Sequence, residues 1–433
     1  MGRTHLEIVY LALGVLGVVP TSYLLINAYL GGRRAARGPG RIVPRSEITI
    51  VTPVRDEPPE VFRESIASIA RQGCPFLVVG DGCLEPYRSL TEALGGRFVG
   101  LRAHLGKKGA FSAGLALVRT PFVLFVDSDT VLPPRAAEDL ASHFAPGVGG
   151  VSANLTVKET GHPVAVCAEF VERAREVVLR AMSTRGSVLY LDGACTMFRT
   201  EVIRPCVASS DFQDLRVLGR PSPLGDDWQL TDFLLRNGYT AVKAYDVRVV
   251  TQPKANFAGF VRQNVRWARS NWIRLGRYVS GRGPKGRSAF FTFEVVGTYG
   301  LPLIALATLL ARLPFVLHDA ARVPSTLDGA AQFLLRDVVG IPRSMVGALV
   351  HLGLTLLGAF ATGLFLGTVL SRSRHPALRL VAYGAVGSAI LFATTVYGLL
   401  TFWKRPRWGD SEDPRTRRWP APVPGGADRP ESS

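Results

Sequence analysis

The sequence predicts an α/β domain with a mostly parallel central sheet, set between segments that cross a membrane. Between residues 45 and 252, short β-branched runs alternate with amphipathic stretches of helical length, which is the order of βαβ units. Outside that region lie long apolar blocks. The 433-residue chain is 47% hydrophobic and yet has a formal net charge of +17. A soluble nucleic-acid-binding protein or a disordered basic chain would be far more polar, so we expect no nucleic-acid partner.

Residues 1–32 are expected to form an N-terminal transmembrane anchor. Residues 8–30 are nearly uncharged, and a helix of this length crosses a hydrocarbon core of about 30 Å. Arg33, Arg34 and Arg37 follow at once. Because Lys and Arg collect on the inner side of membranes, this end should face the cytosol together with the domain that follows it.

The C-terminal membrane region, residues 288–403, contains three apolar blocks, so we expect a multi-pass protein of the cell membrane. If each block crosses once, the basic tail of residues 404–433, which we expect to be disordered, lies outside the cytosol. That placement opposes the positive-inside rule. If the first block is re-entrant, with a break near Gly300 and Pro302, the tail returns to the cytosol. The sequence leaves both topologies open.

Acidic residues follow three of the predicted strands. Asp56 and Glu57 follow the first, Asp81 follows the second, and Asp127 and Asp129 follow the fourth. Ligands of parallel sheets bind at the carboxyl ends of the strands, so these residues should line one rim. Carboxylates there suggest a bound cation, which commonly brings a phosphate. The predicted strands are Ile48–Val54, Phe76–Val79, Arg97–Leu101, Phe122–Val126 and Val148–Val157.

The segment Asp127-Ser128-Asp129 carries the most specific signal. Alternate residues of an extended segment point the same way, so both carboxylates can share a metal, or divide a metal and a ribose between them. Such a triplet is usually a solvated turn, but here it ends a run of five apolar residues, which favours function. Upstream, Lys107 and Lys108 begin a predicted helix whose N-terminus would suit a phosphate, although a solvated basic face is the alternative.

A second acidic pair, Asp226 and Asp227, opens a helical pattern that ends at Asn237. Two carboxylates in a first turn also suit the helix dipole. The spacing alone therefore supports a structural cap as well as it supports a catalytic pair.

Residues 253–287 form a basic amphipathic segment. Apolar residues recur every three or four positions with arginines between them, as in a helix that lies on anionic lipid headgroups. Gln263, Arg266 and Trp267 are spaced so that they neighbour one another on such a helix, where interfacial anchoring is the simpler explanation. The arginines are Arg262, Arg266, Arg269, Arg274 and Arg277.

Taken in order, five motifs resemble the signatures of the processive family 2 glycosyltransferases, which include hyaluronan, chitin and cellulose synthases and the nodulation chitin-oligosaccharide synthase. The resemblance spans roughly residues 47–287 and implies a GT-A fold for residues 45–252. Trp228 stands where those enzymes commonly have Arg. The motifs are Asp81-Gly, Asp127-Ser-Asp-Thr, Asp192-Gly-Ala-Cys-Thr-Met-Phe-Arg, Gly225-Asp-Asp and Gln263-Asn-Val-Arg-Trp.

The resemblance implies a role for each matched residue near the donor. Asp81 would hold the uracil, and Asp227 would be the general base with Asp226 beside it. Asp127 and Asp129 would bind UDP and Mg²⁺ or Mn²⁺. The nucleotide-sugar group as a whole would be Asp56, Glu57, Asp81, Lys108, Asp127 and Asp129.

The acceptor and the diphosphate would be met by Gln263, Arg266, Trp267 and Cys195, with Trp267 stacking on the acceptor sugar. Trp408 follows the last apolar block in the place of a gating motif of hyaluronan synthases. Asp410 and Ser411 replace the Thr and Arg of that motif, which puts the gating role in doubt.

The function implied is an inverting, family 2 hexosyltransferase that moves sugars from a UDP-sugar to a growing β-linked polysaccharide and exports the product through the lipid bilayer. A non-processive membrane transferase that adds one sugar to a lipid or cell-wall acceptor is the alternative within the same fold. The alternative from another class is a basic protein that binds membrane surfaces or nucleic acid without catalysis.

Overall fold

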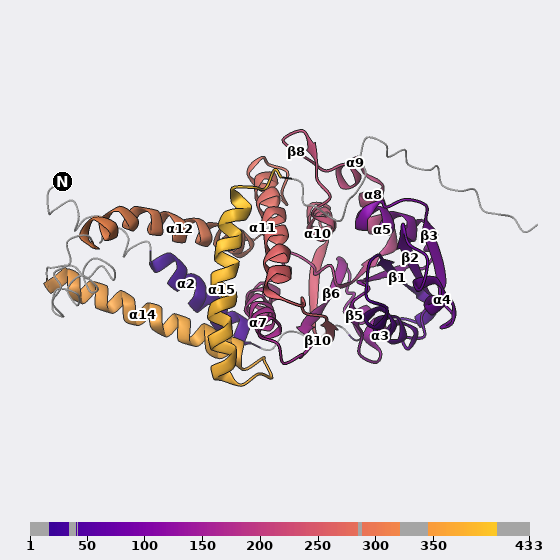
Figure 1. Cartoon of the computed structure of the whole chain (residues 1–433), viewed down its shortest axis with the longest axis horizontal. Helices are drawn as coiled ribbons and strands as arrows, with labels where there is room; N and C mark the ends of the chain where they lie inside the picture. Colours follow the sequence, from indigo (N-terminus) through magenta and orange to yellow (C-terminus); the bar gives the residue numbers. More distant parts are fainter. Residues whose placement is uncertain (1–16, 34–39, 41, 285–287, 321–344, 405–433) are drawn as a thin grey trace, which may run out of the picture.

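The structure, a computed structural model, describes residues 17–33, 40, 42–284, 288–320 and 345–404. Figure 1 shows a sheet-containing domain on one side and a group of long helices on the other. Three further helices lie between them: α7 (Pro163–Ser183), α11 (Phe257–Val279) and α15 (Ala377–Leu399).

The central sheet has the strand order β3-β2-β1-β4-β7-β6-β10-β5. β3, β2, β1 and β4 are parallel to one another, and β6 and β10 are parallel too. β7 is antiparallel to both of its neighbours, and β5 is antiparallel to β10. The strands are β1 (Ile48–Val54), β2 (Phe76–Asp81), β3 (Arg97–Leu101), β4 (Phe122–Val126), β5 (Thr130–Val131), β6 (Val148–Val157), β7 (Cys195–Arg199) and β10 (Thr240–Thr251), with a separate pair β8 (Arg216–Val217) and β9 (Arg220–Pro221).

The expected strands are all present, and the mostly parallel sheet is confirmed. β2 is longer than expected and ends on Asp81 itself. β7 and β10 are not among the strands expected from the sequence. β7 lies within the segment that begins at Asp192, and it inserts antiparallel between β4 and β6, so the parallel order is interrupted at one place.

Helices cover both faces of the sheet because the strands are apolar on both faces. In β4, Phe122 and Leu124 pack into one core cluster while Val123 and Phe125 pack into the other. This is the arrangement that parallel sheets require, since both of their faces are buried. The helices on the first face are α3 (Pro59–Ala70), α4 (Tyr87–Glu92) and α6 (Ala136–Ala141); those on the second are α5 (Gly106–Leu117), α8 (Thr200–Ala208), α9 (Ser210–Gln213) and α10 (Asp226–Arg236).

The group of long helices contains α2 (Val18–Gly32), α12 (Ala289–Ala320) and α14 (Met345–Leu370). Within the described residues, α12, α14 and α15 are long and apolar enough to cross a membrane. α2 is the described part of the expected anchor, whose residues 1–16 lie outside the described ranges.

The break considered near Gly300 and Pro302 is not seen, because α12 continues through both residues as one helix. A proline inside a helix removes one backbone hydrogen bond, and a long apolar helix tolerates that loss. The residues Ala289–Ala320 therefore form one long helix.

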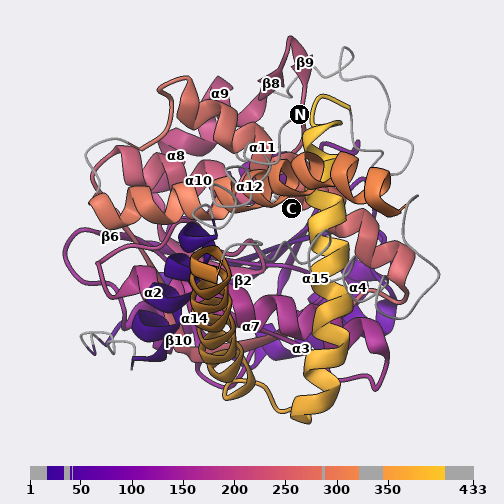
Figure 2. The ribbon, with the colours of Figure 1, turned by 90° about the vertical axis from the view of Figure 1, so that its left-hand side faces the viewer.

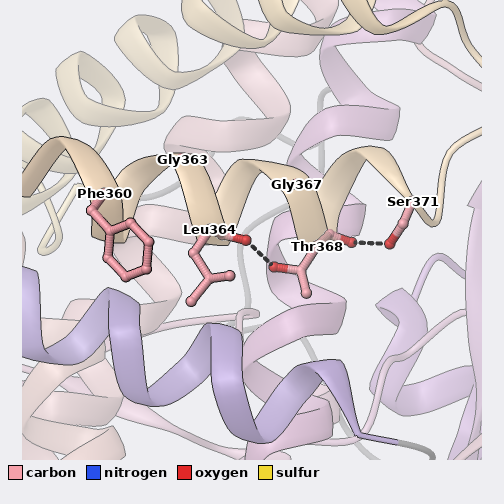
Figure 3. A pocket seen from close by; sticks show the side chains of 6 residues that line it. All are labelled: Phe360, Gly363, Leu364, Gly367, Thr368 and Ser371. Atoms are coloured by element: carbon pink, nitrogen blue, oxygen red, sulfur yellow. Dashed lines mark hydrogen bonds between the residues drawn. The ribbon is translucent and has the colours of Figure 1, made fainter.

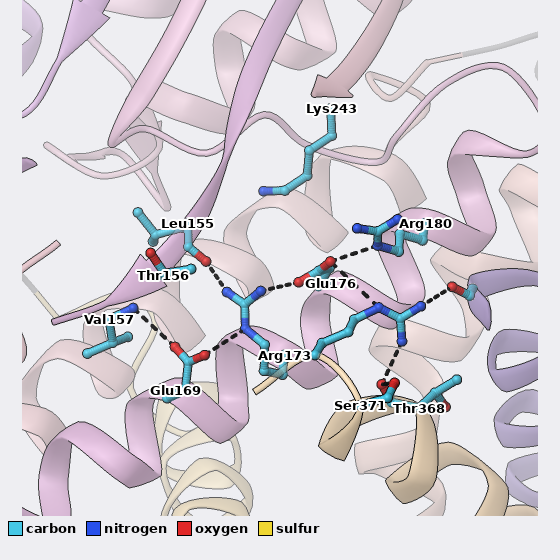
Figure 4. Close-up of polar contacts among 12 residues, drawn as sticks. Leu155, Thr156, Val157, Glu169, Arg173, Glu176, Arg180, Lys243, Thr368 and Ser371 are labelled. Atoms are coloured by element: carbon cyan, nitrogen blue, oxygen red, sulfur yellow. Dashed lines mark hydrogen bonds and ion pairs between the residues drawn. The ribbon is translucent and has the colours of Figure 1, made fainter. Parts of the chain in front are cut away.

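A buried ionic network joins the domain to the helix ends (Figure 4). Arg173 of α7 is 0% exposed and pairs with Glu169 and Glu176. Glu176 also pairs with Arg180 at 2.7 Å and with Arg372, just beyond α14, at 3.6 Å. Arg372 in turn donates to the backbone carbonyls of Thr368 in α14 and Gly31 in α2. The C-terminal ends of α2 and α14 therefore both meet the domain at α7.

Candidate active site

The acidic residues gather where the carboxyl ends of β1, β2 and β4 meet, as the strand order predicts. β1 lies between β2 and β4, with Val51 paired to Leu77 of β2 and to Phe125 of β4. Asp127 follows β4 directly, and its backbone N–H donates to the carbonyl of Ala194, just before β7, at 2.9 Å. The sheet thus fixes the backbone of the acidic triplet from two sides.

Lys107 lies at the centre of the acidic cluster. Its Nζ is 2.7 Å from Asp127 Oδ1 and 3.4 Å from Asp226 Oδ2, and it lies 3.5 Å from the carbonyl of Gly193. Burial alone would lower the pKa of this ammonium, but Asp127 and Asp226 outweigh burial and raise it. Lys107 therefore stays charged and links the β4 rim to the start of α10.

Asp226 and Asp227 lie in the first turn of α10, directly after Gly225. Gly225 has φ of +88°, and a Cβ there would lie 2.3 Å from the Trp228 ring, so only glycine fits this entry to the helix. Burial alone would raise the pKa of Asp226, but Lys107 and Lys108 outweigh burial and lower it. The helix start thus presents one firmly ionised carboxylate next to Asp227.

Asp227 has the electrostatics of a general base. Burial, and then the neighbouring charge of Asp226, raise its pKa to about 6. Its Oδ1 accepts a hydrogen bond from the Trp228 backbone N–H at 2.7 Å. A carboxylate with a pKa just below neutrality is ionised at pH 7 and more basic than an ordinary Asp, which suits proton abstraction.

The two acidic residues after β1 have different surroundings. The Asp56 side chain is 84% exposed and pairs with Arg55 at 3.0 Å. Glu57 turns inward, where Ser128 Oγ donates to its Oε2 at 3.1 Å. Burial, and then the charge of Asp129, raise the pKa of Glu57 to about 7. Of this pair, only Glu57 belongs to the cluster.

The Asp81 carboxylate forms hydrogen bonds with the loop that precedes α5. His104 Nδ1 lies 2.6 Å from its Oδ2, and the backbone N–H groups of Leu105 and Gly106 donate to its two oxygens at 2.6 and 3.0 Å. The carboxylate is thus already bonded on both oxygens and fixes the start of the helix that carries Lys107. The contact of Asp81 with a uracil stays a prediction, since a carboxylate can accept about four hydrogen bonds and Oδ1 accepts one here.

Lys108 lies near enough to Asp226 to lower its pKa, but its hydrogen bond goes to a different side chain. Lys108 is 7% exposed, and its Nζ donates to Gln229 Oε1 of α10. Burial lowers its pKa to about 8. Lys107 is the lysine that pairs with the carboxylates of the acidic cluster. The helical periodicity could have indicated this, because Lys108, Phe111 and Leu115 share the buried face of α5 and Lys107 does not.

Helix α11 brings its predicted residues to the same region. Trp228 of α10 donates from Nε1 to Ser270 Oγ of α11 at 2.9 Å, which joins the two helices. The charge of Arg266 helps to lower the pKa of Asp226, so this guanidinium lies near the acidic pair. Trp228 thus connects α10 to α11.

The indole of Trp267 packs against the guanidinium of Arg175. The guanidinium of Arg175, from α7, lies 5.5 Å from the centre of the Trp267 ring and 5.1 Å from that of Tyr190. Arg175 is held by Glu172 at 2.6 Å and by Asp192 at 3.4 Å. No spacing in the sequence indicated Arg175, because it belongs to a different helix. Gln263 is half-buried, one turn before Trp267 on α11.

Two further side chains singled out in the sequence are buried. Cys195, the first residue of β7, is 1% exposed and packs in the core. Arg274 is buried and forms an ion pair with Asp232 at 2.5 Å, so it does not face lipid headgroups. Trp408 lies outside the described residues.

The residues present fit a divalent cation that is shared with a substrate. Among the described residues, no group of three or more His, Cys, Asp or Glu side chains is arranged as a complete metal site. Mg²⁺ is commonly held by one or two carboxylates together with substrate phosphates, and Asp127 and Asp129 supply that number. Burial, and then Asp129 and Asp226, raise the pKa of Asp127 despite the opposing charge of Lys107, which indicates excess negative charge at the cluster.

A small pocket opens beside the acidic pair, lined by Asp226, Asp227, Asp192 and Gly193 among apolar residues. A second hollow is a shallow groove on α14, next to α2 (Figure 3). It has no charged lining, so the chemistry belongs to the first pocket. The groove is lined by Phe360, Gly363, Leu364, Gly367, Thr368 and Ser371.

The fold is of the GT-A type. The solved mannosyltransferase PcManGT from Pyrobaculum calidifontis, in complex with GDP-Man and Mn²⁺, has a TM-score of 0.56 to this chain at 18% identity, covering 85% of this chain and 100% of its own. At that identity the likeness shows the fold alone. A family model described as glycosyltransferase like family 2 matches residues 31–270, more than half of the sequence. The chain belongs to this family.

Curated relatives include N-acetylglucosaminyltransferases and a hyaluronan synthase. The N-acetylglucosaminyltransferase of Azorhizobium caulinodans is 29% identical over 61% of this chain and 69% of its own length. That of Rhizobium meliloti is 28% identical over 68% of this chain and 73% of its own. The hyaluronan synthase of Streptococcus pyogenes is 23% identical over 92% of this chain and 90% of its own.

Proposed function

We propose that this enzyme transfers a sugar from a UDP-sugar to a hydroxyl of a growing β-linked polysaccharide, with inversion at the anomeric carbon, and exports the product. The observation that carries the proposal is the Asp227 carboxylate, with its pKa raised to about 6, beside a cluster in which Lys107 joins Asp127 to Asp226. A basic membrane-surface or nucleic-acid-binding protein has no use for that arrangement, and family membership favours the enzyme.

Asp227 accepts the proton of the acceptor hydroxyl as its oxygen attacks the anomeric carbon. The bond from that carbon to the diphosphate breaks on the opposite face, and the electron pair leaves with UDP. Lys107 and Arg266 offset the charge of the diphosphate. A Mg²⁺ or Mn²⁺ ion held by Asp127 and Asp129 would supply further neutralisation of the leaving group.

N-acetylglucosamine is the sugar that we propose first. The names of the relatives from Azorhizobium caulinodans and Rhizobium meliloti support it. Extension of a polymer, rather than a single transfer, is supported by Trp267 of α11, because an acceptor sugar can stack on the indole and α11 is joined by Ser270 to Trp228 in the first turns of α10. The apolar helices α12 and α14 beside the domain support export.

The proposal is tested by incubating membranes that contain the full chain with radiolabelled UDP-N-acetylglucosamine, UDP-glucose, UDP-glucuronate and GDP-mannose, and by sizing the products. We expect label from UDP-N-acetylglucosamine in a ladder or a long polymer. A single added sugar would favour the non-processive transferase. The absence of transfer from all four donors would overturn the proposal.

A further inference from the structure

Helix α15 lies against the catalytic domain from its first turn to its end. At the start, Arg379 donates to a backbone carbonyl in the loop before α7 at 2.6 Å. Further along, Trp272 of α11 donates from Nε1 to the carbonyl of Thr395 at 2.9 Å. Just beyond the helix, Arg269 of α11 donates to Thr401 Oγ1 at 3.1 Å. The contacts therefore cover the whole length of α15.

One face of α15 is built for this close contact. A Cβ on Gly384 would lie 2.4 Å from the Phe170 ring of α7, and a Cβ on Gly398 would lie 2.6 Å from Ala268 of α11. Small residues allow helices to approach in this way. The buried residues share one helical face, since they recur at intervals of three, four and seven: Leu380, Gly384, Gly387, Thr394 and Gly398.

The axis of α15 runs across that of α14. In Figure 1 α14 extends away from the domain while α15 stands upright against it, and in Figure 2 α14 is seen nearly end-on while α15 is seen along its length. The C-terminal ends of α2 and α14 both meet the domain through Arg372. The N-terminal end of α12 also meets it, because Phe291 packs in the domain core. A bilayer crossed by α14 therefore has its surface near α15 and parallel to it.

The side of α15 that faces away from the domain is apolar and has cations near both ends. Leu378, Val386 and Leu400 are among its exposed side chains. Arg374 precedes the helix and Lys404 follows it, and both are exposed. An apolar strip between cations suits the boundary between acyl chains and anionic headgroups.

We propose that α15 is an interfacial helix, which lies in the plane of the membrane with its outer face in that boundary. The chain then crosses the membrane with α2, α12 and α14, and Lys404 lies on the same side as the catalytic domain. The basic residues that follow it in the sequence begin on the cytosolic side, as the positive-inside rule requires. The inference rests on the membrane location in the proposed function, but not on the identity of the sugar.

The test is the sidedness of single cysteines in the full chain, read with a membrane-impermeant maleimide. Cys83→Ser removes the one native cysteine of the five that is not buried. Ser432→Cys reports the tail, Ser325→Cys the segment between α12 and α14, and Ser373→Cys the segment between α14 and α15.

We expect Ser432→Cys and Ser373→Cys to react only in inside-out vesicles, and Ser325→Cys only in intact cells. Reaction of Ser432→Cys in intact cells would mean that α15 crosses, and would overturn the proposal. Reaction of all three from the same side would also overturn it, because α12 and α14 would then not cross. A protease-cleavable tag after Ser433 in the otherwise unaltered chain gives the same answer without a cysteine substitution.

The depth of α15 is an independent measurement. Val386 lies near the middle of the helix, on its outer face, and is exposed. A spin label on Val386→Cys, in the Cys83→Ser background, should lie at the boundary between the acyl chains and the headgroups. A depth at the bilayer midplane would contradict the proposal, whatever the donor sugar proves to be.

Discussion

Lys107 is the residue on which the acidic site depends most. It holds Asp127 and Asp226 together, and without its charge these two carboxylates and Asp227 would repel one another. We expect Lys107→Met to lower kcat/KM for the donor by roughly 100-fold or more, the size of loss seen when one charge-stabilising group is removed from an active site.

Lys107→Arg, which keeps the charge, is the matched control and should retain part of the activity. Steady-state rates against donor concentration measure both variants. Equal loss in the two variants would show that shape, and not charge, matters at this position.

The pKa of Asp227 predicts the pH dependence of the reaction. A general base works only in its ionised form, and burial and Asp226 raise the pKa of Asp227 to about 6. We therefore expect kcat to fall about tenfold for each pH unit below that value and to be level above it.

Asp226→Asn removes the neighbouring charge and should move this limb to lower pH, besides reducing the rate. A kcat that stays level well below pH 6 would exclude Asp227 as the base.

Part of the residue assignments was available from the sequence. Asp127 and Asp129 follow β4, and Asp226 and Asp227 open α10, as the sequence patterns predict. Lys107 could have been chosen over Lys108 from the phase of the buried face of α5. The bonded state of Asp81 could not be predicted, because the groups that occupy it are backbone N–H groups of a loop whose path no local pattern sets.

Helices α7 and α11 together position the predicted acceptor platform. Arg175 of α7 lies against Trp267 of α11, so the indole is supported on one side. We expect Trp267→Ala to reduce polymer elongation about tenfold while donor hydrolysis falls much less, since a stacked aromatic contact supplies about 0.5–1.5 kcal/mol beyond the area that it buries.

Trp267→Phe keeps an aromatic surface and should retain much of the elongation. Sized products and released UDP, measured in the same reaction, separate the two activities. An equal fall of both in Trp267→Ala would rule out the stacking role.

The elements themselves were predicted well wherever a periodic pattern was strong. β1, β3, β4 and β6 have the predicted bounds, because apolar, β-branched runs bounded by turn residues define strands. β7 escaped prediction because its place in the sheet depends on pairing with β4 and β6, which are distant in sequence. The sequence predicts that the arginines of residues 253–287 face lipid. In α11, however, Arg274 pairs with Asp232 and Arg277 pairs with Asp211, both in the catalytic domain.

At the scale of the whole molecule, the network around Glu176 connects the catalytic domain to the ends of α2 and α14. Glu176 is 1% exposed and pairs with Arg173, Arg180 and Arg372. Glu176→Gln leaves those cations without their shared carboxylate, and breaking a buried ionic network costs roughly 3–5 kcal/mol.

We expect a clearly lower midpoint in thermal unfolding of the detergent-solubilised variant. Glu138→Gln is the matched control, because its partners Arg45 and Arg135 are exposed, and it should change the midpoint little. Similar shifts in the two variants would show that the network does not hold the parts together.

The membrane part could be predicted from the sequence only as a set of apolar blocks. Hydropathy makes α12, α14 and α15 equivalent, since all three satisfy the same length and composition. Packing distinguishes them, because only α15 presents a face of glycines to α7 and α11. That distinction depends on a close fit between distant segments, which a local measure of hydropathy does not detect.

We propose sugar transfer at the acidic cluster, with Asp227 as the base. The most direct measurement compares the wild type with Asp227→Asn for incorporation of radiolabel from UDP-N-acetylglucosamine and, in the same preparations, for UDP binding. We expect the variant to lose transfer but to bind UDP with nearly unchanged affinity. Asparagine keeps the shape of the side chain, and the Lys107 contacts with Asp127 and Asp226 remain. Retained transfer by Asp227→Asn would contradict the proposal.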